Sequence, residues 1–214
     1  MAAAGSLNPG ATPSQGGNTP REDARDQAAR AAATQLEEEL RQAGLELLGC
    51  CQHMSGRGPG VLQHAPLLED FTPEELDTLG EAMLLIRAQP GQVLIREGDK
   101  SDWMLLLLSG TVDVSKATPP RAHDPVTQDH SSRLGVVIEG TSLGEMSMFD
   151  SDVRYASCTA IDTVEAAVLG RAAIGQLIRR HPGVGAKLVV KITQLLAQRL
   201  RNTSNQLVRL LQQP

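Results

Sequence analysis

The chain has 214 residues, enough for one domain of ordinary size plus an appendage, and its hydrophobic fraction of 41% supports a packed core. No run of 18 apolar residues and no secretory signal occurs, so the composition excludes a membrane-spanning helix and favours the cytoplasm. The net charge of −5 is uneven, because residues 171–214 carry eight basic and no acidic residues. A nucleic-acid interface is one interpretation of this asymmetry. We favour a solvated helix that pairs with the acidic remainder, and we do not expect DNA binding.

The three cysteines, Cys50, Cys51 and Cys158, are too few and odd in number for a disulfide framework. A metal site at the adjacent pair would have His53 as its only nearby partner. We favour an inert surface or helix-packing pair, and predict no metal site.

The first part of the chain divides into a tail and a helical region. Residues 1–22 have the composition of a disordered tail. Residues 23–52 are predicted to be helical, since Leu36, Leu40, Ala43 and Leu47 share one helical face. A glycine-rich break follows at residues 55–60, so residues 23–60 are interpreted as an N-terminal helical appendage and linker.

Helical signals continue after the break. A short helical stretch is expected around residues 61–68. A second helix should begin at Thr72, with Pro73 in its first position and Glu75 placed to complete a capping box. This helix would carry Leu76 and Leu79 on its apolar side.

From Leu84 the pattern changes to short apolar runs separated by glycines, which predicts a small β-barrel or roll. The polar composition of residues 117–132 predicts a long loop between two of the strands. The expected strands span residues 84–88, 93–95, 103–108, 111–115, 134–138, 156–160 and 164–169. The fold class is therefore α+β, with a jelly-roll-like β-roll of about eight strands flanked by helices.

The chain should end in helices at residues 171–181 and from residue 184 to about 211, with Pro182 and Gly183 between them. In the second helix, apolar and threonine residues recur at alternating steps of four and three, which is a heptad seam. We interpret residues 183–214 as a lid or dimerisation helix, with packing of the seam onto the chain's own roll as the alternative. The seam consists of Val189, Thr193, Leu196, Leu200, Thr203, Leu207 and Leu210.

The segment that carries chemistry is residues 143–160. Gly144 permits a close backbone approach, and the carboxylate of Glu145 can accept hydrogen bonds from a sugar hydroxyl. Arg154 follows nine residues later and presents a planar fork of donors that suits phosphate oxygens. A short helix between them would direct free backbone N–H groups at the same anion.

Leu143-Gly144-Glu145-Met146-Ser147-Met148 together with Arg154 resembles the phosphate-binding cassette of cyclic nucleotide-binding domains. That family includes the catabolite activator protein and the regulatory subunits of cyclic-AMP-dependent protein kinase. Residues 90–99 and 105–114 resemble two further signatures of the family, in the expected order. The resemblance covers about residues 66–182, and we assign residues 61–182 to a cyclic nucleotide-binding domain.

The resemblance implies that Glu145 binds the ribose 2′-hydroxyl and that Arg154 pairs with the cyclic phosphate. It implies that the backbone N–H groups of Gly144, Glu145, Met146, Tyr155 and Ala156 complete the site. Tyr155 departs from the family pattern, in which Ser, Thr or Ala follows the arginine. A Ser or Thr there is associated with cyclic GMP, so Tyr155 weakens that preference and adds bulk at the pocket mouth.

Thr203 and Ser204 resemble a Thr-Ser pair that caps adenine in the family's bacterial activators, which favours cyclic AMP over cyclic GMP. In those activators the long helix leads into a DNA-reading domain, whereas this sequence ends at Pro214. We therefore expect a stand-alone, cytoplasmic cyclic nucleotide receptor, without enzymatic activity or a cofactor. It would signal through an unidentified protein partner and could form a homodimer through its last helix. The alternatives are a ligand-free roll acting as an interaction scaffold, and a receptor for cyclic GMP or cyclic di-GMP.

Overall fold

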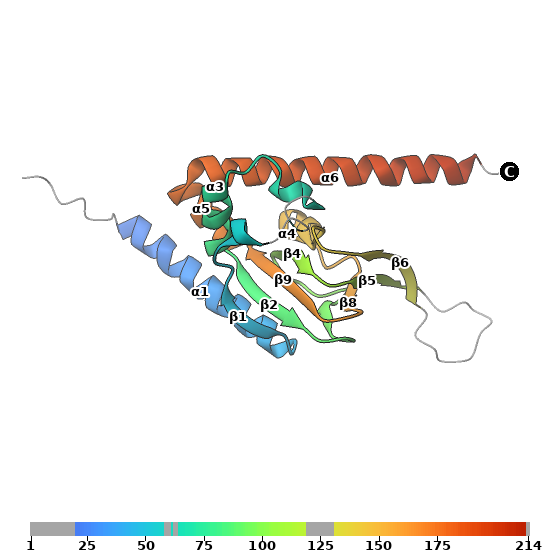
Figure 1. Ribbon diagram of the computed structural model, residues 1–214, viewed down its shortest axis with the longest axis horizontal. Helices are drawn as coiled ribbons and strands as arrows, with labels where there is room; N and C mark the ends of the chain where they lie inside the picture. The colour runs from blue at the N-terminus through green and yellow to red at the C-terminus, as the bar shows by residue number, and fades with distance from the viewer. Residues whose placement is uncertain (1–19, 58–60, 62–63, 119–130, 213–214) are drawn as a thin grey trace, which may run out of the picture.

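A computed structural model describes residues 20–57, 61, 64–118 and 131–212. Most of the predicted tail and of the predicted 117–132 loop lies outside the described residues, as does part of the 61–68 stretch. The described residues form nine strands in two antiparallel sheets, which confirms the predicted roll (Figure 1). The strands are β1 (Glu46–Cys50), β2 (Leu84–Ala88), β3 (Val93–Ile95), β4 (Trp103–Ser109), β5 (Val112–Ala117), β6 (Ser131–Val137), β7 (Ser142–Leu143), β8 (Ser157–Ala160) and β9 (Val164–Gly170).

The two sheets have strand orders β1-β2-β9-β4-β7 and β3-β8-β5-β6. The helices are α1 (Pro20–Gln42), α3 (Pro73–Glu81), α4 (Glu145–Asp150), α5 (Arg171–Arg180) and α6 (Pro182–Leu211), with short 3-10 turns at Met54–Gly56 and Pro66–Leu68. Figure 1 shows α6 running along one side of the roll, with α4 between it and the sheets and α1 on the side of β1.

Strand β4 contributes side chains to two hydrophobic cores, one on each face of its sheet. Its side chains alternate between the two faces of the sheet, as in any strand. Leu105 and Leu107 face the interior of the roll, whereas Met104, Leu106 and Leu108 face the helices. Because both faces are covered, six consecutive residues of β4 are buried and the strand reads as a continuous hydrophobic run.

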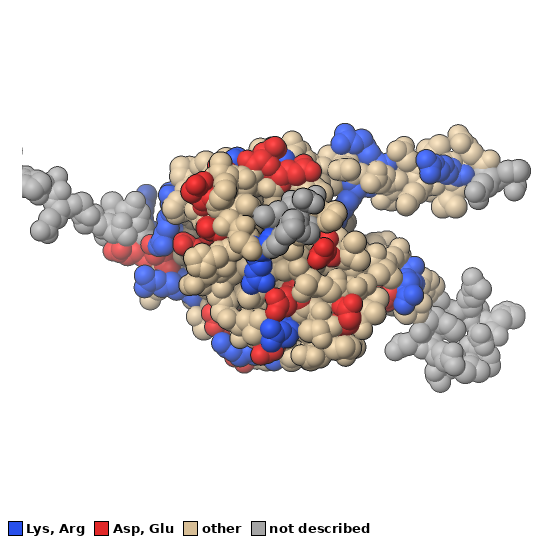
Figure 2. Space-filling view, in the orientation of Figure 1, with Lys and Arg blue, Asp and Glu red and all other residues tan. Residues whose placement is uncertain are grey.

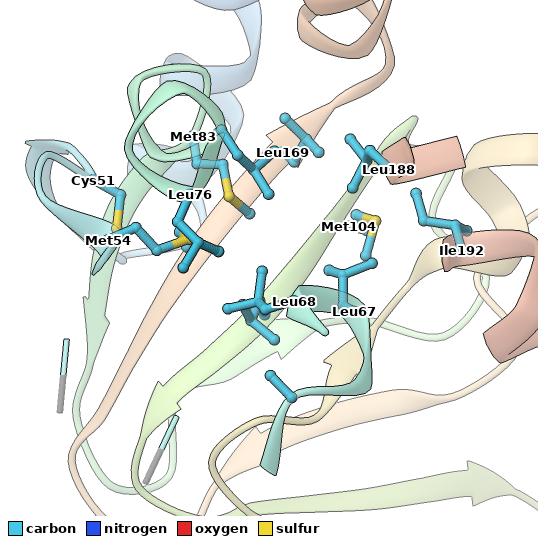
Figure 3. Close-up of a cluster of buried hydrophobic side chains, with 14 of the residues drawn as sticks. Cys51, Met54, Leu67, Leu68, Leu76, Met83, Met104, Leu169, Leu188 and Ile192 are labelled. Atoms are coloured by element: carbon cyan, nitrogen blue, oxygen red, sulfur yellow. The ribbon is translucent and has the colours of Figure 1, made fainter. Parts of the chain in front are cut away.

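The core between the sheet and the helices joins segments that are distant in the sequence. Figure 3 shows Met104 and Leu169 of the sheet beside Leu188 and Ile192 of α6, with Leu76 of α3 in the same cluster. The first half of α6 is thereby fixed to the body of the domain by apolar burial.

Charged groups hold the same half of α6. Lys191 Nζ donates to Asp70 Oδ2 at 2.6 Å, and Lys187 pairs with Glu75. Glu75 also completes the predicted capping box with Thr72, so one carboxylate joins the start of α3 to α6. The prediction that the basic residues of the last helix pair with acidic ones is correct for these two lysines.

The prediction of a helix through residue 52 is wrong. Helix α1 ends at Gln42, and Gly44 adopts a left-handed φ of 79°. The N–H of Leu45 bonds to Leu40 O at 3.1 Å and that of Gly44 bonds to Arg41 O at 2.9 Å, the pattern of a glycine-terminated helix. The chain then reverses, and residues 46–50 pair with β2 as strand β1. Leu47 continues the helical spacing of apolar residues beyond Gly44 only by coincidence, because it belongs to strand β1.

The second half of α6 leaves the body of the domain. Val189 and Leu196 of the predicted seam pack partly against the core. All residues from 200 to 211 are exposed, including Leu200, Leu207 and Leu210. The seam therefore packs on the chain's own domain in its first half, and its second half is exposed among the described residues. No described helix is apolar over a length sufficient to cross a bilayer.

Candidate functional site

The candidate site begins where β7 turns into α4. Gly144 sits at this junction with a left-handed φ of 81°, a conformation that favours glycine. A Cβ atom at residue 144 would overlap Nη1 of Arg154. The backbone of Gly144 therefore lies directly against the guanidinium, as the sequence-based expectation of a close approach requires. Strand β7 itself was missed, because a two-residue strand carries no periodicity.

Glu145, the first residue of α4, is a buried carboxylate whose side chain is 1% exposed. Its Oε1 accepts a hydrogen bond from Nη1 of Arg199. Its Oε2 is buried and has no hydrogen-bond partner in the part of the chain that the structure describes. A buried carboxylate oxygen without a partner is costly, so this atom is suited to accept a donor from a ligand.

Arg154 is 2% exposed and lies between the cassette and the start of β4. Its guanidinium stacks on the ring of Trp103, at 4.5 Å from the carbon Cζ to the ring centroid. Burial lowers the pKa of Arg154 from its ordinary value, although a guanidinium stays protonated at neutral pH. Among the described residues, no carboxylate lies within ion-pair distance of this cation. A buried cation without a carboxylate is the arrangement that a bound anion would complete.

Arg199 of α6 belongs to the site, and the sequence analysis missed it. Besides its contact with Glu145, its Nη2 donates to the carbonyl oxygen of Ser142 at 2.6 Å. This arginine thus connects the long helix to both ends of the β7–α4 turn. The sequence did contain a signal for Arg199. It lies one helical turn before Thr203, on the helix that the resemblance had already placed against the nucleotide.

Two residues at the mouth of the cassette are open to solvent. Met146 is 50% exposed and Tyr155 is 59% exposed. The Tyr155 ring lies 3.9 Å from Nζ of Lys116, measured to the ring centroid, and its carbonyl oxygen accepts from the same amine at 2.7 Å. Lys116 also pairs with Glu97 at 3.1 Å. These contacts hold the tyrosine against Lys116 of strand β5, at the edge of the cassette.

The structure brings Gly144, Glu145 and Arg154 together with Arg199. Ala156 follows Tyr155 and is half-buried where β8 begins. Thr203 and Ser204 lie beyond Arg199 on α6 and are exposed; the Thr203 hydroxyl donates to the carbonyl oxygen of Arg199 at 3.0 Å. These two hydroxyl residues therefore face solvent within a single chain.

The pattern of the cyclic nucleotide-binding domain family matches residues 85–181. The structure is similar to that of a cyclic nucleotide-binding domain from Methylobacillus flagellatus, with a TM-score of 0.64, 31% identity, and 77% of this chain and 88% of that one covered. A similarity of 25% identity over 151 residues links the chain to the CRP-like cAMP-activated global transcriptional regulator of Mycobacterium tuberculosis, covering 71% of this chain and 62% of that protein.

A further similarity is to lysophospholipase nte1 of Aspergillus fumigatus, at 29% identity over 145 residues, or 66% of this chain. The chain spans only 8% of that protein's length. The matches to the family pattern and to the M. flagellatus domain agree with the observed roll and cassette. The chain belongs to the cyclic nucleotide-binding domain family.

Proposed function

We propose that this chain is a cyclic nucleotide receptor, that it prefers cyclic AMP to cyclic GMP, and that it catalyses no reaction. The observation that carries the proposal is a pair of buried charged groups in one cassette that the protein satisfies only in part. Glu145 Oε2 lacks a donor, and the cation of Arg154 lacks a carboxylate among the described residues. A ribose hydroxyl supplies the donor, and a cyclic phosphate supplies the anion.

The remaining contacts follow from the cassette's backbone and from α6. The N–H groups at Gly144, Glu145, Met146, Tyr155 and Ala156 complete the phosphate site in this proposal. In this proposal Thr203 and Ser204, which face solvent within a single ligand-free chain, contact the base when the nucleotide is bound, and their hydroxyls favour the amino group of adenine. Tyr155 stands where a small hydroxyl residue would favour guanine. Receptor output passes to a protein partner in the cytoplasm, where the three free thiols of the described structure would remain reduced.

We also propose that α6 joins two copies of the chain through its exposed second half. Figure 2 shows this end of the helix standing clear of the roll in the view drawn. Leu200, Leu207 and Leu210 are 69%, 57% and 66% exposed, and they lie on the heptad seam. Sedimentation of the wild type should show a dimer, and Leu207→Glu should sediment as a folded monomer. A monomeric wild type at high protein concentration, with or without nucleotide, would contradict this part.

A second function, a protein-interaction scaffold without a ligand, is favoured by one specific observation. Arg154 is 2% exposed and its guanidinium already has protein acceptors, so it fits a structural role as well. The two functions differ in whether the cassette binds a small molecule.

Isothermal titration calorimetry with cyclic AMP, cyclic GMP and cyclic di-GMP tests the receptor function. Arg154→Ala should weaken binding by about 100-fold, because each hydrogen bond to a charged group contributes about 1.5–3 kcal/mol. Arg96→Ala is the matched control, since Arg96 is an exposed arginine of the same domain. Absence of heat with all three ligands, in protein shown to be folded, would refute the receptor function and favour the scaffold.

A further inference from the structure

The hydrogen bonds of Arg154 bear on how tightly the chain binds a nucleotide. The inference from them rests on the proposed function. A guanidinium has five N–H donors. Four of them are used inside the protein. Nε donates to Ser101 Oγ at 2.6 Å, Nη1 donates to Gly144 O at 2.6 Å and Ser147 Oγ at 2.8 Å, and Nη2 donates to Trp103 O at 2.5 Å. One N–H, on Nη2, is left without an acceptor among the described residues.

The four acceptors differ in their freedom to move. The carbonyls of Gly144 and Trp103 are backbone groups, one fixed at the β7–α4 turn and the other at the start of β4, where Trp103 lies opposite Gly170 of β9. The hydroxyls of Ser101 and Ser147 are side-chain groups that can rotate about one torsion. Ser101 is half-buried in the segment before β4, and Ser147 is 5% exposed on the inner side of α4.

A phosphate bound by arginine accepts two parallel N–H bonds in its strongest geometry. With one N–H available, Arg154 cannot present such a pair until at least one internal acceptor releases it. The backbone carbonyls are held by the fold, so the hydroxyls are the groups that give way.

We propose that Ser147 and Ser101 set the nucleotide affinity of this chain by holding, in the ligand-free state, the N–H groups of Arg154 that the phosphate needs. They act as positioning residues: each stabilises the free state by a hydrogen bond to a charged group, and the ligand has to compete with it. Removing either hydroxyl therefore tightens nucleotide binding, even though it removes a polar contact from the site.

Calorimetric titration of cyclic AMP into Ser147→Ala and Ser101→Ala tests the proposal. Each variant should bind about tenfold more tightly than the wild type, the equivalent of one such hydrogen bond. Ser101→Thr keeps the hydroxyl at a half-buried position and should retain the wild-type affinity. Ser109→Ala is the matched control, because Ser109 lies at the opposite end of β4 from Trp103. Ser101→Ala keeps the test available if the more deeply buried Ser147 variant fails to fold.

A ligand-free measurement separates this proposal from a general loosening of the domain. The Nε–H signal of Arg154 in a proton–nitrogen NMR spectrum should exchange slowly with water in the wild type and at least tenfold faster in Ser101→Ala. Backbone amides of β4 should keep their protection in both proteins. A wild type that binds cyclic AMP while both alanine variants bind equally or more weakly would overturn the proposal alone. A folded wild type that binds no cyclic nucleotide would overturn the proposed function, and this inference with it.

Discussion

The ion pair between Glu145 and Arg199 predicts a large coupling between the cassette and the long helix. Glu145 is 1% exposed and Arg199 is 39% exposed by side chain. Replacing Arg199 by Met keeps an apolar stem but leaves both oxygens of the buried carboxylate without a partner. Breaking a fully buried pair from one side costs about 3–5 kcal/mol. Because water screens the exposed arginine, we expect a smaller loss, about 2 kcal/mol of unfolding free energy.

Glu145→Gln should cost less than Arg199→Met, since the stranded arginine can turn toward water. The double variant should be about as stable as Glu145→Gln alone, which corresponds to a coupling energy of about 2 kcal/mol, the full cost of Arg199→Met. Urea denaturation of the four proteins in the absence of nucleotide measures this cycle, provided that the denaturant slopes agree. Arg201→Met, at an exposed position two residues further along α6, is the control and should change stability by less than about 0.5 kcal/mol. Additive losses from Glu145→Gln and Arg199→Met would refute the reasoning.

Three further predictions concern the thiols, the start of α3 and acid stability. Burial raises the pKa of Cys158 to about 12, so in the native protein an exposed Cys50 should react with a thiol reagent in seconds while Cys158 reacts only after denaturation; equal rates would be contrary evidence. Thr72→Ala should lower stability in urea by about 1 kcal/mol, and Thr72→Ser, which keeps the capping oxygen, should not. Hydrogen bonding from Lys187 lowers the pKa of Glu75, so its contribution is present above the unfolded value of about 4.3 and is lost as pH falls through the folded value. Thermal scans should show that Glu75→Gln is less stable than the wild type at pH 7, with a smaller difference near pH 3; an equal difference at both pH values would exclude this linkage.

Some of the fold could be read from local signals alone. The start of α3 follows from Thr72, Pro73 and Glu75, because a capping box and an N-terminal proline act within one turn. Strands β2 and β3 have the predicted bounds, since each is a short apolar run closed by turn residues. The end of α1 at Gln42, marked by the left-handed Gly44, was equally local, and the prediction missed it by following apolar spacing instead of the glycine stop.

The sequence by itself determined seven of the nine described strands, the cassette and the identity of its two charged residues, because each depends on neighbours in the chain. Tertiary structure decided what those charges contact. The pairing of Glu145 with Arg199 joins residues 54 positions apart, and the bond from Arg154 to Trp103 spans 51 positions. Only the folded domain brings these pairs of residues into contact. Only the packing of α6 shows that the first half of its apolar seam is buried and the second half is exposed. Local propensity has no information about contacts of this range, since they form when separate elements share one core.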